Sequence, residues 1–102
     1  MRLLVALDLP VQTIAQRKVA TQFRNWLVKD GYYMVQFSLY ARTCNGYDSV
    51  ATHHERLISH LPENGSVRYL VITERQYESM EILVGELKKE ETPITPEQLT
   101  LY

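Results

Sequence analysis

The sequence RLLVALDL at residues 2–9 is a nearly continuous apolar run that contains Asp8 close to its end. A run of this length and composition predicts a central β-strand that is buried on both faces. Pro10 follows, and proline cannot donate a hydrogen bond to a neighbouring strand, so the strand is expected to end before it. The fold is therefore predicted to be built around an N-terminal strand that carries a carboxylate at its end.

Two amphipathic helices are predicted after this strand. The segment 12–30 opens with Thr13 and Gln16, which have the spacing of a capping box, and its apolar residues then recur at helical intervals. A second helix is expected to be capped by Asp48 and to end before Pro62. Its inward stripe is predicted to consist of Val50, His54, Leu57, Ile58 and Leu61.

Three further segments have strand character. Residues 32–43 alternate with a period of two, as one long strand would, and SVRYLVIT at 66–73 and MEILVG at 80–85 follow, joined by a polar connection at 74–79. Two arrangements of the predicted strands and helices remain possible. One is a sandwich of two crossovers and a hairpin, and the other is a ferredoxin-like βαββαβ plait.

Length and composition restrict the class of protein. The chain has 102 residues, of which 45% are hydrophobic and 23% charged, which is typical of one globular domain and excludes a disordered protein. The apolar runs have the length of strands, so no membrane span is predicted. The first residues do not follow the order of a signal peptide, and the single cysteine, Cys44, fits a reducing compartment. The chain is expected to be cytoplasmic.

Charge is distributed unevenly along the chain. Residues 1–68 contain eight Lys and Arg against five acids, whereas residues 69–102 contain three against seven. The body therefore has a net charge of +3 and the remainder −4, although the whole chain is close to neutral at −1. A basic body favours a nucleic-acid partner without deciding it.

The C-terminal residues differ from the rest. Residues 1–85 are predicted to form the folded domain and residues 86–102 a tail, in which ELKKEE is a solvated spacer and two prolines prevent a helix. The final QLTLY is prone to form a strand, and an isolated strand is stable only on the edge of a sheet. Leu99 and Leu101 are therefore expected to dock on another subunit.

Asp8 is the strongest candidate for chemistry. A carboxylate at the end of an apolar strand can cap the next helix or pair with an arginine. It can also bind Mg²⁺, which uses one or two protein carboxylates, and two copies of Asp8 facing each other across a twofold axis would supply both. Zinc is not expected, because adjacent His53 and His54 point about 100° apart on a helix and Cys44 has no second cysteine.

Basic side chains offer a second candidate site. Arg17, Lys18 and Arg24 lie on the first predicted helix, and Arg42 lies at the end of the second predicted strand. They form either an ordinary solvated surface or a set of phosphate contacts, for which the arginine guanidinium is well suited.

Several of these segments together resemble one known family. They are MRLLVALDLP at the N-terminus, RK at 17–18, FRNWLVKDGYYMVQFSLYARTCNGYD at 23–48 and GSVRYLVITERQYESMEILVG at 65–85. This combination is similar to CRISPR-associated protein two, the small subunit of the spacer-acquisition machinery, in the version found in type II systems. The resemblance covers about residues 1–85 and implies an α+β ferredoxin-like fold and a homodimer joined through its sheets.

The resemblance also implies a function. Members of the family are described as metal-dependent endoribonucleases, and some of them cut double-stranded DNA. The resemblance implies that the functional aspartate of the family corresponds to Asp8 and that Mg²⁺ is shared across the dimer. Family members often carry an aromatic residue before that aspartate, where this chain has Leu7. The resemblance assigns nucleic-acid binding to Arg17 and Lys18, and to Arg42.

A second role implied by the resemblance is architectural. The family dimer bridges two dimers of a partner integrase and supports a duplex DNA prespacer, which requires no catalysis by Asp8. The tail with Leu99 and Leu101 would then dock on the other protomer or on the integrase. A nuclease, a DNA-bridging scaffold and a toxin-like endoribonuclease all remain open at this point.

Overall fold

The structure is a computed structural model that describes residues 1–86. Its elements follow the order βαββαβ and end with a short helix, which confirms the ferredoxin-like arrangement over the alternative with two crossovers. They are β1 (Arg2–Asp8), α1 (Ile14–Lys29), β2 (Tyr33–Gln36), β3 (Leu39–Thr43), α2 (Tyr47–Ser59), β4 (Ser66–Ile72) and α3 (Glu74–Glu78). The predicted docking strand, with Leu99 and Leu101, lies outside the described residues.

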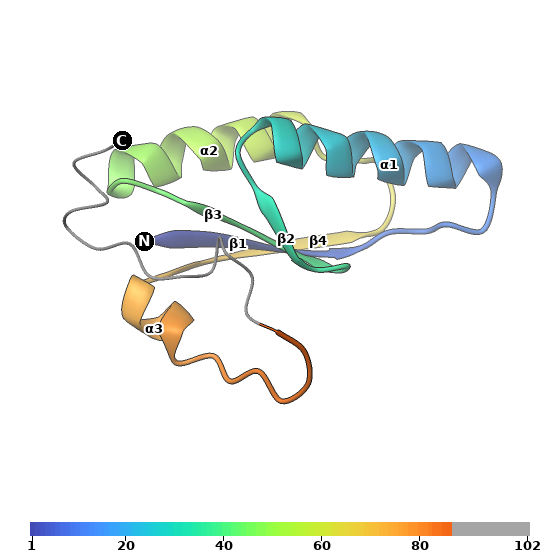
Figure 1. Ribbon diagram of the computed structural model, residues 1–102. Coiled ribbons are helices and arrows are strands. Elements are labelled where there is room, and N and C mark those ends of the chain that lie inside the picture. The colour runs from blue at the N-terminus through green and yellow to red at the C-terminus, as the bar shows by residue number, and fades with distance from the viewer. Residues whose placement is uncertain (87–102) are drawn as a thin grey trace.

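The four strands form one antiparallel sheet in the order β2-β3-β1-β4. β1 is central, as the sequence predicted, and pairs with β3 on one edge and with β4 along its whole length on the other. Figure 1 shows α1 and α2 side by side on one face of the sheet, and α3 on the opposite side. Within residues 1–86, neither long helix is apolar enough over a sufficient length to cross a bilayer.

The core lies between the sheet and the two long helices. Leu3, Val5 and Leu7 of β1 are at most 5% exposed and face the helices. The alternate positions differ, because Leu4 is half-buried and Ala6 and Asp8 are exposed. The prediction that β1 is buried on both faces is therefore wrong, since no long helix covers its second face. The other buried members of the core cluster are Phe23, Leu27, Tyr32, Tyr40, Cys44 and Leu57.

Residues 32–43 form a hairpin and not the single strand that their alternation predicted. Phe37 and Ser38 make the turn between β2 and β3, and the register shifts between Met34 and Gln36. Within residues 1–86 no residue other than glycine has a positive φ, so this turn needs neither Gly nor Asn and gives no signal in the sequence. The period of two continues across the turn, which explains the error.

The helix ends confirm one sequence prediction and correct another. Thr13 and Gln16 make the predicted capping box of α1, with the Gln16 amide 3.1 Å from the Thr13 hydroxyl. In α2 the N-cap is Gly46 and no side chain caps the helix, so Asp48 lies in the first turn and acts only through the helix dipole. Of the predicted inward stripe of α2, Leu57 is buried whereas Ile58 and Leu61 are 55% and 44% exposed.

The chain after β4 also differs from expectation. The predicted polar connection at 74–79 contains α3, which begins with a capping box made by Thr73 and Gln76. Residues 80–85 do not form the predicted strand, because α3 turns the chain away from the β4 edge of its own sheet. Leu83 and Val84 are left 86% and 95% exposed.

Arg2 connects α3 to the sheet. Its side chain is fully buried, its Nε lies 2.8 Å from a Glu74 carboxylate oxygen, and its guanidinium lies 4.1 Å from the centre of the Tyr77 ring. It also donates a hydrogen bond to the Tyr33 hydroxyl. Burial opposes the charge of Arg2, but the bonds to Glu74 and Tyr33 outweigh this effect and raise its pKa. Arg2 therefore stays charged and anchors α3 to the sheet.

We predict that loss of the acid in this pair destabilises the fold more than loss of the base. Glu74→Ala leaves a buried guanidinium without its carboxylate, and because Glu74 is 26% exposed the cost should be about 2–3 kcal/mol, below that of a fully buried pair. Arg2→Met leaves the Glu74 carboxylate, which can turn to water, so the free energy of unfolding should fall by only about 1 kcal/mol. Urea unfolding measures both, and Glu78→Ala, an exposed acid on the same helix, is the matched control. Equal losses for Glu74→Ala and Glu78→Ala would contradict the anchor.

Candidate functional site at the end of the central strand

Asp8 is the last residue of β1, and its side chain lies on the face of the sheet that α1 and α2 do not cover. It is exposed, and within residues 1–86 its carboxylate makes no hydrogen bond or ion pair. The next helix is capped by Thr13, so Asp8 is not a helix cap. Neither of the structural roles considered for Asp8 is therefore found in the described part of the chain.

The backbone of Asp8 is held on the side of β4. Asp8 pairs with Ser66, and Gly65 before it has a φ of 96°, in the left-handed region that favours glycine. A Cβ added at Gly65 would lie 2.7 Å from the Asp8 carbonyl oxygen, so only glycine permits this close approach. The connection from α2 to β4 thus packs directly against the candidate site.

The turn between β2 and β3 lies on the other side of the strand end. The Leu7 amide donates to the Ser38 carbonyl oxygen over 2.7 Å, which places this turn beside Asp8. Phe37 in the turn is 72% exposed. The Arg24 guanidinium of α1 lies 3.9 Å from the centre of the Phe37 ring and donates to the Phe37 carbonyl oxygen.

Arg68 is a basic residue near Asp8 that no pattern in the sequence indicates. It pairs with Ala6, and because residues opposite each other in an antiparallel sheet share a face, Arg68 lies on the same face as Asp8. Asp8 and Arg68 are diagonal neighbours, a separation that long side chains can bridge. Only the register between β1 and β4 reveals this relation, since sixty residues separate the two in sequence.

Arg17 and Lys18 lie at the same end of the sheet but on α1, whose first turns follow the strand after a short loop (Figure 1). Both side chains are exposed. One guanidinium nitrogen of Arg17 donates to the carbonyl oxygens of Val11 and Gln12, over 3.1 Å and 3.2 Å, so Arg17 also stabilises the loop that leaves Asp8.

Arg42 is not brought to this site. It pairs with Leu3, five residues before Asp8, which corresponds to roughly 17 Å along an extended strand. Its guanidinium donates to the Asp30 carbonyl oxygen at the end of α1 and lies 3.1 Å from the His53 Nδ1. The predicted role of Arg42 in phosphate binding therefore has no support from the geometry, which instead gives it a contact inside the fold.

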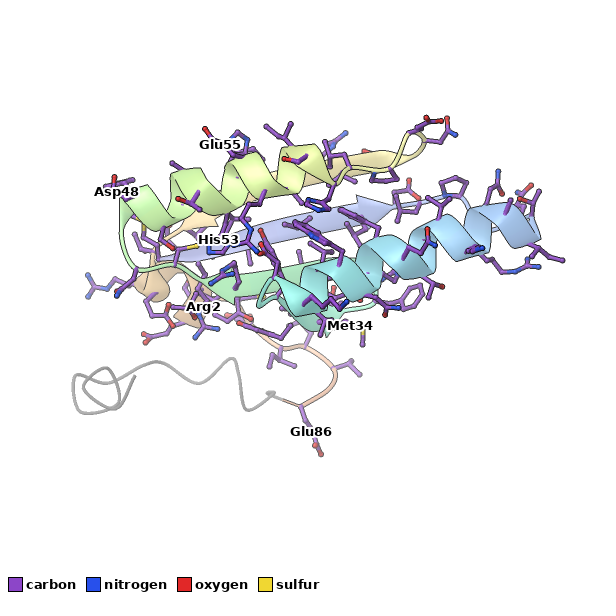
Figure 2. All side chains as sticks on the ribbon, turned by 90° about the horizontal axis from the view of Figure 1, so that it is seen from above. Arg2, Met34, Asp48, His53, Glu55 and Glu86 are labelled. Carbon is purple, nitrogen blue, oxygen red and sulfur yellow. The ribbon has the colours of Figure 1, made fainter. Side chains whose placement is uncertain are left out.

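Arg42 belongs to a buried polar cluster that joins α1 to α2. The Asp30 carboxylate lies 3.0 Å from His53 Nδ1 and pairs with Arg56. His53 lies on α2 between the two long helices (Figure 2). Nearby Tyr32 is buried, and burial together with the charge of Asp30 raises its pKa to about 12. These contacts explain the polar residues at this end of the core without a ligand.

The donors near Asp8 restrict the metal that this chain could hold. Within residues 1–86 no three His, Cys, Asp or Glu side chains are grouped to bind an ion. Two of the histidines instead contact aromatic rings: His60 stacks on Trp26 with the ring centres 4.2 Å apart, and His54 lies tilted against Tyr69 with the ring centres 4.4 Å apart. A lone exposed carboxylate fits Mg²⁺ as one half of a shared site, because that ion needs few protein ligands and retains water.

Comparison with known proteins places this arrangement in a family. The family model described as "CRISPR associated protein Cas2" matches residues 1–80. The CRISPR-associated endoribonuclease Cas2 of Acidovorax ebreus is 46% identical over 102 residues, which is the full length of both chains. The protein of the same name from Campylobacter jejuni is 41% identical over 102 residues, all of this chain and 71% of that protein.

A solved structure agrees with these matches. The crystal structure of Streptococcus pyogenes Cas2 at pH 6.5 superposes with a TM-score of 0.62 at 26% sequence identity, over 82% of this chain and all of that one. The family model covers both β1 with its terminal Asp8 and the whole βαββαβ body, as the resemblance seen in the sequence implied. The chain therefore belongs to the Cas2 family of CRISPR-associated proteins.

Proposed function

We propose that this chain is an endoribonuclease of the CRISPR adaptation machinery and that Asp8 is its catalytic residue. The observation that carries the proposal is an exposed carboxylate, unpaired within residues 1–86, at the end of the central strand. Relatives that are 46% and 41% identical over the whole chain are named endoribonucleases. An exposed acid that contributes no contact to its own fold is available to bind a metal ion or substrate.

The active form that we propose is a homodimer joined through the open face of the sheet. Leu70, on that face of β4, is 60% exposed, and Leu83 and Val84 after α3 are more exposed still. Apolar surface of this kind is stabilised by burial against a second copy. A twofold axis over this face would bring the two Asp8 carboxylates together, which supplies the second ligand that one chain lacks.

The two Asp8 carboxylates would hold Mg²⁺, which would supply stabilisation of the phosphodiester charge and a bound water of lowered pKa. The residues of this chain have separate tasks in the proposal. Asp8 holds the ion, Gly65 allows the backbone that positions Asp8, and Arg68 on the same face can neutralise the phosphate. Hydrolysis would then depend on electrostatic stabilisation more than on a dedicated general base.

A second candidate function is a scaffold that binds duplex DNA and bridges a partner integrase in the cytoplasm. Arg17 and Lys18 favour it, because they are exposed on α1, on the helical side of the sheet and away from the face that carries Asp8. A binding surface separate from the carboxylate could support DNA without any catalysis. Contacts of this type recognise phosphate and not sequence.

We expect Asp8→Asn to reduce RNA cleavage to the level of a reaction without protein, because the variant keeps the size of the side chain and removes its charge. Chelation by EDTA should have the same effect on the unmodified protein, and added Mg²⁺ should restore cleavage. Gel analysis of a labelled RNA measures both, and Asp48→Asn, an exposed acid on α2, is the matched control.

The same variant separates the two candidate functions. If Asp8→Asn abolishes cleavage but supports spacer integration by the reconstituted integrase, the scaffold role stands without catalysis. Cleavage that persists in Asp8→Asn would rule out Asp8 as the catalytic residue.

We expect Arg17→Ala combined with Lys18→Ala to weaken duplex DNA binding and to reduce its dependence on salt. Each phosphate contact contributes about 0.9 to the slope of log K against log salt concentration, so two lost contacts should lower the slope by about 2. Titrations at several salt concentrations give this value. The matched control combines Lys29→Ala with Arg75→Ala, two exposed cations elsewhere. An unchanged slope in the Arg17 and Lys18 variant would show that neither side chain contacts phosphate.

The C-terminal tail remains a separate prediction. We expect deletion of residues 94–102, which removes Leu99 and Leu101, to weaken the homodimer or the complex with the integrase, because a terminal strand gains its hydrogen bonds by joining a sheet edge. Light scattering reports the dimer mass and a pull-down reports integrase binding. If both are unchanged, the tail has no role in docking.

A further inference from the structure

Ser66 lies directly opposite Asp8 in the sheet. It is the first residue of β4, and the antiparallel pairing of β1 with β4 places the two residues in register. Residues opposite each other in such a pair share a face of the sheet, and their Cβ atoms lie about 4.5–5.5 Å apart. Both side chains are exposed. The Ser66 hydroxyl therefore lies on the open face, within reach of a ligand bound to the Asp8 carboxylate.

The hydroxyl of Ser66 has no role in the described fold. Within residues 1–86 it makes no hydrogen bond to another protein group. The hydroxyls of Ser59 and Ser79 differ, because they donate to carbonyl oxygens of the preceding turn over 2.8 Å and 2.7 Å. The strand does not call for serine either, since strands favour β-branched and aromatic residues. A hydroxyl that the strand does not need is available to a ligand on the open face.

The backbone holds Ser66 in a fixed position relative to Asp8. Gly65, immediately before it, approaches so closely that an added Cβ would lie 2.7 Å from the Asp8 carbonyl oxygen. From Ser66 to Ile72, β4 then pairs with β1 without interruption. Side chains on two strands that are paired in this way keep their separation when a ligand binds, which is the condition for a preorganised site.

A hydrated cation held by Asp8 needs partners beyond the carboxylate. Mg²⁺ uses few protein ligands and retains several waters. Groups that surround the ligands orient them through hydrogen bonds, and a serine hydroxyl can both donate and accept. Of the neighbours of Asp8 on this face of β1 and β4, Ala6 has no polar side chain and Arg68 has a positive charge, which a cation repels. Ser66 is therefore the neutral polar neighbour that can serve such an ion.

We propose that Ser66 is a positioning residue for the cation held by Asp8, and that its hydroxyl forms a hydrogen bond with the hydration shell of that cation. The inference rests on the proposed function and adds a residue to its site. In the proposed homodimer the twofold axis supplies one such hydroxyl beside each carboxylate. Ser66 thus acts through the ion and does not itself touch the reacting atoms.

The test measures binding of the ion in the absence of RNA. Mn²⁺ takes the place of Mg²⁺, because it prefers the same oxygen ligands and its EPR signal is lost when it binds to protein. Ser66→Ala should weaken binding of Mn²⁺ by about 10- to 100-fold, the usual cost of removing a group that orients metal ligands. Ser66→Thr keeps the hydroxyl and should retain the affinity of the unmodified protein. Asp8→Asn is the reference for loss of the carboxylate itself.

Two control variants make the result specific. Ser59→Ala removes an exposed hydroxyl on α2 and should leave the affinity for Mn²⁺ unchanged. Arg68→Gln removes a positive charge from the same face as Asp8, so the affinity for the ion should not fall. Thermal unfolding and light scattering show whether each variant keeps its fold and its oligomeric mass. A changed mass in Ser66→Ala would place Ser66 in a protein contact and overturn its role toward the ion.

Failure of the role of Ser66 can be distinguished from failure of the proposed function. If Asp8→Asn loses Mn²⁺ but Ser66→Ala binds it as the unmodified protein does, or if Ser66→Thr loses it too, only the role of Ser66 is wrong. If the unmodified protein binds no Mn²⁺, or Asp8→Asn binds it equally well, the metal site at Asp8 fails and the role of Ser66 fails with it. If both residues are needed for Mn²⁺ but the unmodified protein cuts no RNA, the role of Ser66 stands and the endoribonuclease proposal fails.

Discussion

The pairing of β1 on both of its edges is the constraint on which the rest of the structure depends. Hydrogen bonds to β3 and β4 fix the register of β1 on both sides, and the two long helices cover one face. Leu3, Val5 and Leu7 therefore face the core, and Leu4, Ala6 and Asp8 face outward. A shift of one residue would exchange the two sets and bury Asp8 without a partner, so the register that forms the core also exposes the carboxylate.

The open face of the sheet is covered at one end and exposed at the other. At the start of β1, Arg2 is buried under α3 by Glu74 and Tyr77, so that end is closed by contacts within the chain. At the far end Asp8 has no such partner within residues 1–86, and its neighbours on the same face, Ala6, Ser66 and Arg68, are exposed. The open face is therefore covered by contacts within the chain at the Arg2 end and exposed at the Asp8 end. The exposed end is the basis of the proposed dimer and of its shared metal ion.

The basic residues show that charge in a sequence does not identify a binding surface. Arg42 and Arg24 both contact backbone carbonyl oxygens, but Arg42 lies inside the polar cluster of Asp30 whereas Arg24 lies on an exposed ring. Arg68 shares a face with Asp8 only because of its register with Ala6. The same residue type therefore has a structural role in one place and is available to a ligand in another.

The sequence by itself determined the features that depend on neighbouring residues. The apolar run that makes β1 central, the end of that strand at Asp8, the capping box of Thr13 and Gln16 and the family resemblance were all readable from local patterns. The tertiary structure alone decided what depends on distant pairing. The hairpin with Phe37 at its tip has no glycine or asparagine to reveal it, and the positions of Arg68 and Arg42 relative to Asp8 follow from strand register. Local patterns carry propensity and periodicity, whereas which side chains share a face or become buried is settled only when strands far apart in the chain align.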